Sequence, residues 1–199
     1  MPHKLIALAL ICAAVGHVAN AQAADRAQQM QRVVDGLNSP DPVTRMVTLE
    51  DALANGDKNL KQIAISTALA SSDQTVRTAA VEAAFSQKPS FVIEFVAGPE
   101  GKMDYWESTG GSIEVQIKDF NKDTGTFMGT TPYATSRDKQ RVYKLGAISG
   151  DRISFDVSVG GFAGDNCRGS VSAKDGGTLM KGTMSCDDIP YDIQVDLLR

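Results

Sequence analysis

Apolar residues between positions 25 and 85 recur every three or four places, which is the spacing of one face of an α-helix. The breaks in this pattern carry turn and capping residues, at Asn38 to Pro42, at Asn55-Gly56 and at Ser71 to Asp73. Asp41 followed by Pro42 is typical of an N-cap and a first helical residue. We therefore predict four helices, over about 25–37, 42–55, 58–70 and 74–85.

After Gly101 the pattern changes to an alternation of apolar and polar residues, which is typical of strands with one buried face. The alternation is clear over 113–117, 153–159 and 191–197, and short polar or glycine-rich turns separate the runs. We predict six or seven antiparallel strands in an up-and-down meander, closed as a small barrel or folded as a sandwich. The expected fold class is α+β, with a helical domain over 24–98 and an antiparallel β domain over 99–199.

Within the second half, Gly176-Gly177 is a two-residue turn signal between two strand-like runs. If these glycines form the turn, Cys167 and Cys186 face each other across the hairpin, within disulfide reach. The cysteines then lie on the apolar face, and the opposite face is mostly polar. We predict a Cys167–Cys186 disulfide; a three-residue loop would shift this register.

The N-terminus has the pattern of a secretory signal peptide. Lys4 provides a basic start, an apolar run of about 14 residues follows, and small residues up to Ala23 form cleavage motifs. An uncleaved anchor helix is the alternative, although the run is short of the roughly 20 residues that span a bilayer. We expect cleavage near Ala23, with 1–23 removed, and a periplasmic or secreted protein with no membrane span in the mature chain.

Composition then excludes several kinds of chemistry. Both histidines, His3 and His17, lie in the signal segment, so the mature chain cannot build a Ser-His-Asp triad or a histidine zinc site. A disulfide would also remove the two remaining thiols as nucleophiles. The net charge of −4 argues against nucleic acid and against anionic membrane surfaces as partners. No feature of the sequence calls for a cofactor.

An internal repeat of period 32 runs through the helical half. Positions from Leu37 to Leu53 match those from Leu69 to Phe85 in caps, an arginine, an acid and apolar residues. The segments Asp41-Pro-Val-Thr-Arg45 and Asp73-Gln-Thr-Val-Arg77 resemble the D-x-x-[VA]-R start of a HEAT-like repeat helix, over about 37–96. This resemblance implies stacked helical hairpins in which the Asp and Arg make structural contacts between turns. The alternative is two unrelated amphipathic hairpins.

Two such repeats are fewer than the three or so that a free-standing solenoid needs, so other parts of the chain must cover their ends. The segment 88–96 has the Phe, Val and Ile content of a strand. Its register with the repeat favours a helix, and we predict a short helix or an irregular connector there. In the β domain, the Gly125 to Gly129 hairpin is distantly similar to avidin-type or lipocalin-type barrels, which implies a fold and no binding residues.

Candidate ligand-binding residues are few. Tyr105 and Trp106 could stack on a sugar or another flat ligand, or fill a core. Phe162 lies in a glycine-rich loop that could form the lip of a pocket, or simply connect two strands. Ser136 to Lys139 matches S-x-x-K but lacks the partner motifs of that catalytic family.

Oxygen ligands alternate at Asp119, Asn121 and Asp123, as at the start of a calcium loop. The glycine comes one place late and no bidentate Glu follows, so the alternative is a hairpin turn built with Asn, Asp and Gly. Asp187-Asp188 is expected to be a solvated turn, although a carboxylate pair for glycan hydrolysis remains open.

The function that these features favour is an exported, non-catalytic protein that binds a protein or envelope component through its helical repeats and its β domain. The first alternative is a small-ligand-binding β-barrel. The second is a carboxylate-based hydrolase of cell-wall glycan.

Overall fold

The computed structural model describes residues 23–103, 111–131, 144–159, 165–173 and 177–199. The predicted signal peptide and its cleavage site near Ala23 lie at or beyond the edge of this described part. The chain forms two compact units, Met1–Ile63 and Ala64–Arg199, and each is taken by itself below. In the described part of the chain, no helix combines the length and the apolar character that a membrane crossing requires.

The first unit contains a helix over residues 23–37, then α2 (Pro42–Asn55) and the start of α3 (Lys58–Leu69). Asp41 caps α2, because its carboxylate accepts hydrogen bonds from the backbone N–H groups of Val43 and Thr44. Gly36 lets the first two helices approach closely, since a Cβ there would lie 2.5 Å from Thr48 Oγ1. The predicted helices of this unit are confirmed.

The turn before α2 and the turn before α4 (Gln74–Ser86) make the same hydrogen bonds 32 residues apart. Arg45 Nη1 donates to the Ser39 carbonyl at 2.7 Å, and Arg77 Nη1 donates to the Ser71 carbonyl at 2.8 Å. In each turn the N-cap aspartate N–H also donates to the serine hydroxyl at 3.2 Å. The period of 32 therefore describes a structural repeat, while its HEAT-like nature stays a resemblance.

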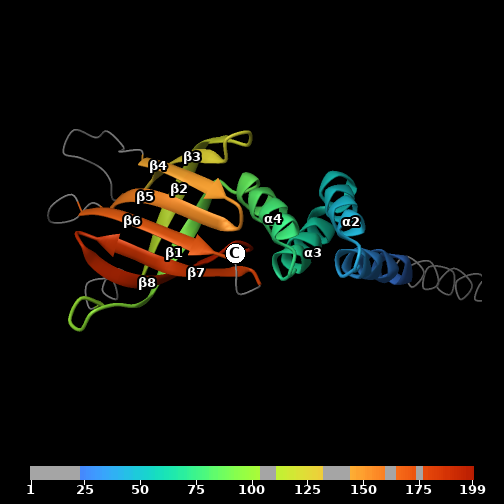
Figure 1. The fold of residues 1–199 in the computed structure, drawn as a ribbon, viewed down its shortest axis with the longest axis horizontal. Coiled ribbons are helices and arrows are strands. Elements are labelled where there is room, and N and C mark those ends of the chain that lie inside the picture. Colours follow the sequence, from blue (N-terminus) through green and yellow to red (C-terminus); the bar gives the residue numbers. More distant parts are fainter. Residues whose placement is uncertain (1–22, 104–110, 132–143, 160–164, 174–176) are drawn as a thin grey trace, which may run out of the picture. The chain divides into compact units, whose positions relative to one another are not determined.

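The second unit is built on a closed, eight-stranded antiparallel barrel, in which each strand pairs with the next and β8 pairs with β1 (Figure 1). The strands are β1 (Ser90–Ala97), β2 (Ser112–Asn121), β3 (Thr126–Thr130), β4 (Lys144–Ser149), β5 (Arg152–Val159), β6 (Asp165–Ser172), β7 (Leu179–Cys186) and β8 (Ile189–Asp196). The up-and-down meander is confirmed, and of the two predicted closures the barrel is the one that forms.

Two predictions about the barrel were wrong, namely the structure of residues 88–96 and the number of strands. Residues 90–97 form a strand and not a helix or a connector, and the barrel therefore has eight strands instead of six or seven. Phe91, Ile93 and Phe95 alternate into the core, and β1 completes the ring by pairing with both β2 and β8. Local strand propensity and the need to close the barrel outweigh the register of the helical repeat.

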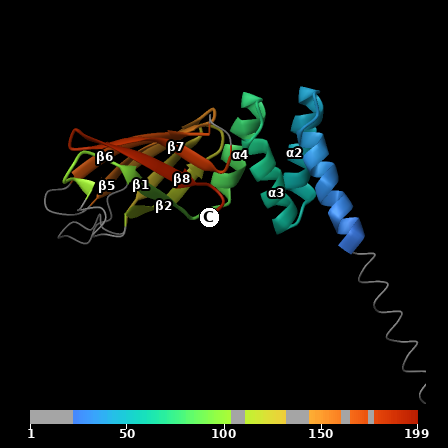
Figure 2. The ribbon, with the colours of Figure 1, turned by 90° about the horizontal axis from the view of Figure 1, so that it is seen from below.

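Helix α4 closes one end of the barrel, as two perpendicular views show (Figures 1 and 2). Phe85, which is 1% exposed, contacts the rings of Phe91, Phe120 and Phe127, with centroids 5.6, 5.4 and 4.6 Å away. At the side of this contact, the Arg77 guanidinium donates through Nε and Nη2 to Asp151 Oδ2, at 3.1 and 3.0 Å. Helix α4 is therefore part of the barrel unit and covers one end of its core.

The interior of the barrel is packed with side chains. Aromatic rings fill the space over glycines, since a Cβ at Gly146 would lie 2.1 Å from the Phe127 ring and one at Gly169 would lie 2.8 Å from the Phe155 ring. The described inward-facing apolar residues of all eight strands are buried. Such packing is what an eight-stranded barrel has when side chains occupy its interior.

The predicted disulfide is confirmed, and it lies inside the barrel. Cys167 and Cys186 are directly paired across β6 and β7 with Cα atoms 4.1 Å apart. Both residues are buried. The predicted register is also confirmed along the whole hairpin, from the cysteines to the Ser172–Lys181 pair, although Gly176 itself lies outside the described residues.

Candidate functional site

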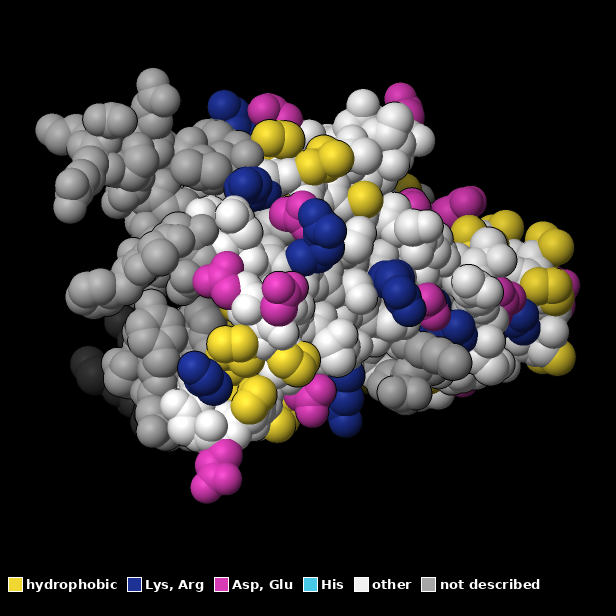
Figure 3. Space-filling view, turned by 60° about the vertical axis from the view of Figure 1, so that its left-hand side comes forward, with side chains coloured by type: hydrophobic (Ala, Val, Ile, Leu, Met, Phe, Trp, Pro, Cys, Tyr) yellow, Lys and Arg dark blue, Asp and Glu magenta, His cyan; other side chains and the backbone are white. Residues whose placement is uncertain are grey.

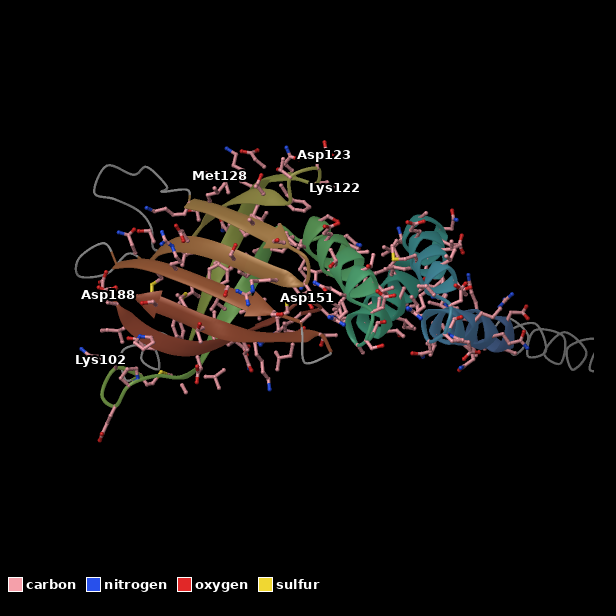
Figure 4. All side chains as sticks on the ribbon, viewed as in Figure 1. Lys102, Lys122, Asp123, Met128, Asp151 and Asp188 are labelled. Atoms are coloured by element: carbon pink, nitrogen blue, oxygen red, sulfur yellow. A yellow bond between two sulfur atoms is a disulfide. The ribbon has the colours of Figure 1, made fainter. Side chains whose placement is uncertain are left out.

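The two ends of the barrel differ in what surrounds them. The β2–β3 and β4–β5 turns lie at the end that α4 covers, and Asp151 lies beside that helix in Figure 4. The β7–β8 turn, Asp187-Asp188, lies at the opposite end, next to the disulfide (Figure 4). We call this opposite end the disulfide rim. Because the strands run up and down, the β1–β2, β3–β4 and β5–β6 connections join strand ends at the same rim.

A groove of about 530 Å³ lies at the disulfide rim, and we call it the wall groove because core-facing residues (Val157 and Cys167) and outward-facing residues (Asp156 and Arg168) of the barrel wall both line it. It crosses four consecutive strands from β4 to β7 and ends at the β7–β8 turn. Its volume is within the range of sites that hold small ligands. Its lining consists of Lys144, Asp156, Val157, Asn166, Cys167, Arg168, Ser185, Asp187 and Asp188.

The middle of the wall groove holds a two-point ion pair. Arg168 donates from Nε to Asp156 Oδ1 at 2.9 Å and from Nη2 to Asp156 Oδ2 at 3.2 Å. The two residues face each other across β5 and β6, which fixes the pair in the sheet register. The carboxylate of Asp156 raises the pKa of the Arg168 guanidinium further above its ordinary value, so this cation is permanent. The Arg168 side chain is 83% exposed and remains open to a ligand.

The two ends of the wall groove carry opposite charges. Lys144 lies at the β4 end, and Asp187 and Asp188 lie at the β7–β8 turn. Within the described part of the chain, none of these three side chains makes an ion pair or a hydrogen bond. Figure 3 shows acidic and basic side chains side by side on the barrel surface. Among the described residues, the groove thus has a cation and an acidic pair that no other side chain neutralises.

The acidic end depends on an unusual turn. Asp187 and Asp188 have φ values of 48° and 66°, and they connect the directly paired residues Cys186 and Ile189. A two-residue hairpin turn of this kind favours Asn-Gly, because both positions need a positive φ. Two aspartates hold these positions at a conformational cost, which places two carboxylates at the rim.

The aromatic candidates Tyr105, Trp106 and Phe162 lie outside the described residues, as does the S-x-x-K segment from Ser136 to Lys139. The strands that flank these segments end at the disulfide rim, where the wall groove lies. Their roles as ligand contacts stay predictions.

The calcium candidates lie in and beside the β2–β3 turn, at the other end of the barrel. Asn121 Oδ1 accepts the backbone N–H groups of Asp123 at 2.9 Å and Thr124 at 3.2 Å, as in a hairpin turn. Asp119 has φ 55° at an irregularity in the β2–β3 pairing. The described residues hold no group of three or more His, Cys, Asp or Glu side chains placed to bind a metal ion. The turn accounts for these residues, and the calcium site stays a prediction.

Sequence reasoning missed most of the wall groove because its residues come from four strands. Only Asp187-Asp188 and the cysteines were singled out, and the acids were expected to be a solvated turn. One signal was available: Asp156 and Arg168 are equally far in sequence from position 162, so a hairpin centred there sets them opposite each other. Opposite charges at facing positions on the outer side of a sheet indicate a cross-strand pair.

The chain matches no protein-family model, and comparison with curated proteins and with solved structures finds no significant match. A function for this protein must therefore be argued from its own residues.

Proposed function

We propose that this chain is an exported, non-catalytic binding protein that recognises a protein or envelope component on its outer surface. The observation that carries the proposal is the packed barrel with a charged groove at its disulfide rim. Phe85 fills one end of the interior, and Phe127 and Phe155 occupy the space over Gly146 and Gly169. A ligand then meets the protein on the wall and the rim.

The same packing counts against the small-ligand cup. A cup needs an apolar cavity that encloses most of its ligand. Here an added methyl group at Gly146 would already collide with the Phe127 ring. Room for a ligand in this part of the interior would require the aromatic core to move.

The helical half adds an apolar surface suited to a protein partner. Val43 and Val47 lie one turn apart on α2 and are 67% and 58% exposed. Exposed apolar side chains that neighbour one another are more common at interaction surfaces than singly scattered ones. Binding through both the helical repeats and the barrel would engage this strip and the wall groove.

Export and the absence of catalysis rest on the sequence. The signal-peptide pattern directs the chain out of the cytoplasm, and a disulfide persists in an oxidising compartment. The mature chain has no histidine, and its cysteines are bonded to each other. The carboxylate hydrolase is the second candidate, because three aspartates line the wall groove. One of them, Asp156, is already held by Arg168.

Affinity capture from envelope extract tests the proposal. The tagged mature protein is compared with a groove variant, Lys144→Gln with Arg168→Gln, a helix variant, Val43→Ser with Val47→Ser, and a control, Lys122→Gln. We expect a component that the wild type and the control retain and that at least one surface variant loses. Equal recovery by all four proteins, or a tightly held small molecule in native mass spectrometry with no specific partner, would overturn it. Release of reducing sugar from cell-wall glycan by the wild type, lost in Asp187→Asn with Asp188→Asn, would establish the hydrolase instead.

A further inference from the structure

The outer side of strands β5, β6 and β7 has a polar surface that is rich in cations. The three strands lie side by side (Figure 1), and their outward-facing residues alternate with buried core residues. The register sets the outward residues in rows across the strands, and we call these rows together the cationic face. The rows are Arg152, Ser172 and Lys181; Ser154, Ser170 and Thr183; and Asp156, Arg168 and Ser185.

The cationic face carries a positive charge in a chain whose net charge is −4. Its cations are Arg152, Arg168 and Lys181, and its acid is Asp156. Arg168 already holds Asp156 through two hydrogen bonds, at 2.9 and 3.2 Å. Arg152 and Lys181 are exposed, and in the described part of the chain neither side chain forms an ion pair or a hydrogen bond. Two cations are therefore available to an anionic ligand.

Short hydroxyl side chains lie between these cations. Ser172 separates Arg152 from Lys181 in their row. The next row along the strands consists only of hydroxyl residues, Ser154, Ser170 and Thr183. A hydroxyl group can both donate and accept hydrogen bonds, so it can bind the hydroxyl groups of a sugar. Because these side chains are short, a ligand can approach the sheet between the longer cations.

The side chains that form the cationic face also narrow the class of its ligand. Protein interfaces are usually centred on buried aromatic or arginine anchors, and single-stranded nucleic acids stack their bases on aromatic rings. None of the described residues that form the face is aromatic or aliphatic. Cations interspersed with hydroxyls are instead complementary to a polymer that carries both acidic and hydroxyl groups. An acidic polysaccharide is such a polymer.

The curvature of the barrel favours a flexible chain over a rigid ligand. From β5 to β7 the face follows two of the eight strand steps around the ring, so its outward side chains diverge. Arg168 lies four residues along β6 from Ser172, which is about 13 Å. A flexible polysaccharide can follow this curved surface and place successive acidic groups near successive cations. The cationic face ends at β7, since Asp192 on β8 lies opposite Thr183.

We propose that the cationic face binds an acidic polysaccharide. Carboxylates of the polymer pair with Arg152, Lys181 and Arg168, and its hydroxyl groups bind the serine and threonine side chains between these cations. Arg168 also lines the wall groove, so the two surfaces are continuous. This inference rests on the proposed binding function and names the class of envelope component that the barrel recognises.

Titration of the mature protein with polygalacturonate, by calorimetry at low ionic strength, tests the ligand class. Methyl-esterified polygalacturonate keeps the sugars but lacks the charge, whereas polyglutamate and single-stranded DNA carry the charge on other polymers. We expect polygalacturonate to bind best, and we expect esterification to weaken binding about tenfold. No saturable binding of polygalacturonate, or equal or tighter binding of the ester, polyglutamate or DNA, would overturn the proposal.

Charge variants locate the site. Arg152→Gln with Lys181→Gln should weaken polygalacturonate about tenfold, because two exposed ionic contacts are lost. Lys102→Gln with Lys122→Gln is the matched control, since both lysines are exposed, lie outside the cationic face and remove the same charge (Figure 4). The control should bind like the wild type. Equal weakening in the two double variants would show a general charge effect and would contradict the site.

A third variant tests the hydroxyl groups without changing the charge. Ser170→Ala with Thr183→Ala should weaken polygalacturonate about threefold and should reduce its advantage over polyglutamate, because hydrogen bonds to the sugars are lost. An unchanged advantage would contradict the role of these hydroxyls in recognising a sugar.

The two proposals fail separately. If polygalacturonate does not bind but the envelope component is still lost from the groove or helix variant, the polysaccharide inference falls and the binding function stands. If no specific component is retained either, both fall.

Discussion

Asp119 forms a β-bulge that changes the face of the sheet on which the next residue, Phe120, lies. The β2–β3 register advances by one residue between the Lys118–Met128 pair and the Asn121–Thr126 pair, and Asp119 sits at this bulge with φ 55°. Without the extra residue, Phe120 would point outward like Lys118. With it, the Phe120 ring turns to the core side and meets Phe85. An acidic residue that suggested a metal ligand in the sequence thus has a backbone role.

The backbone at Asp119 leads to the first prediction. Asp119→Val should lower the free energy of unfolding by about 1–2 kcal/mol, because a β-branched side chain disfavours the left-handed region. Asp119→Gly should be neutral or stabilising, since glycine adopts this conformation freely. Urea unfolding measures both, and Glu114→Val, at a regular outward position of β2, is the control. A similar loss at both positions would contradict the bulge interpretation.

Asp57, in the first unit of the chain, has a lowered pKa that should make stability depend on pH. It forms an ion pair with Arg26, and its carboxylate also accepts the backbone N–H of Leu60 at 3.0 Å. The hydrogen bond from Arg26 and the contact with the α3 N-terminus lower the pKa of Asp57 to about 2. In an unfolded chain the pKa of an aspartate is about 3.9.

The direction of this shift predicts a pH dependence. Because the folded pKa is the lower one, the pair adds stability above about pH 4, and the contribution is lost as pH falls towards 2. Asp57→Asn keeps a capping side chain but cannot ionise, so its stability should change less between pH 4 and pH 2. Urea titrations followed by helical circular dichroism measure this difference. Parallel pH profiles for wild type and variant would show that the pair contributes nothing.

At the scale of elements, α4 is the helix on which the barrel depends most directly. Its Phe85 joins an aromatic cluster with rings from β1, β2 and β3, and its Arg77 holds the β4–β5 turn through Asp151. Arg77 and Asp151 are mostly buried, with 12% and 15% of their side chains exposed. The geometry of a guanidinium with two donors on one carboxylate fixes the direction in which the helix meets the turn.

Truncation of Phe85 tests this role. Phe85→Ala should cost about 3–5 kcal/mol, because it opens a cavity beneath three rings, and Phe85→Leu should cost less. Urea unfolding, followed by a spectroscopic signal of the β-barrel, gives the loss in free energy of unfolding. Val96→Ala, at an apolar side chain that is 57% exposed, provides the comparison and should stay within about 0.5 kcal/mol. Barrel stability that is the same in Phe85→Ala and wild type would mean that the barrel folds independently of α4.

The element β1 marks where prediction from sequence fails. Residues 90–97 follow a helical repeat, and their register with that repeat favoured a helix, whereas Phe91, Ile93 and Phe95 carry the two-residue period of a strand. The deciding interaction is the pairing of β1 with β8, about a hundred residues away in sequence. The local sequence pattern of residues 90–97 does not identify a pairing partner so far away, so the closure of the barrel could not be predicted from this segment.

At the scale of the whole molecule, the features that were predicted are those encoded locally. Asp41 and Asp73 identified helix starts, and the Cys167–Cys186 spacing identified a register. The wall groove could not be predicted in the same way, because Lys144 and Asp188 line one groove only once four strands lie side by side. The position of each groove residue depends on the registers of three successive strand pairs, from β4–β5 to β6–β7.

The disulfide belongs to this scale because it stabilises the hairpin that forms part of the groove wall. It closes a loop of about 20 residues, so its removal should lower the free energy of unfolding by about 3 kcal/mol. Cys167→Ala with Cys186→Ala, or treatment of the wild type with a reductant under unfolding conditions, should show this loss in urea. Reduction should release two thiols, and finding them already free in the native protein would contradict the pairing.

Closure of the barrel has one more consequence, for how a partner can be recognised. A sheet with a free edge can accept a guest strand through main-chain hydrogen bonds, whatever the side chains of the guest. Here β1 and β8 satisfy each other, so the ring has no such edge. β-strand addition to this ring is therefore not open to a partner, and the binding that we propose would depend on side chains such as Arg168. The same closure protects the protein from edge-to-edge aggregation.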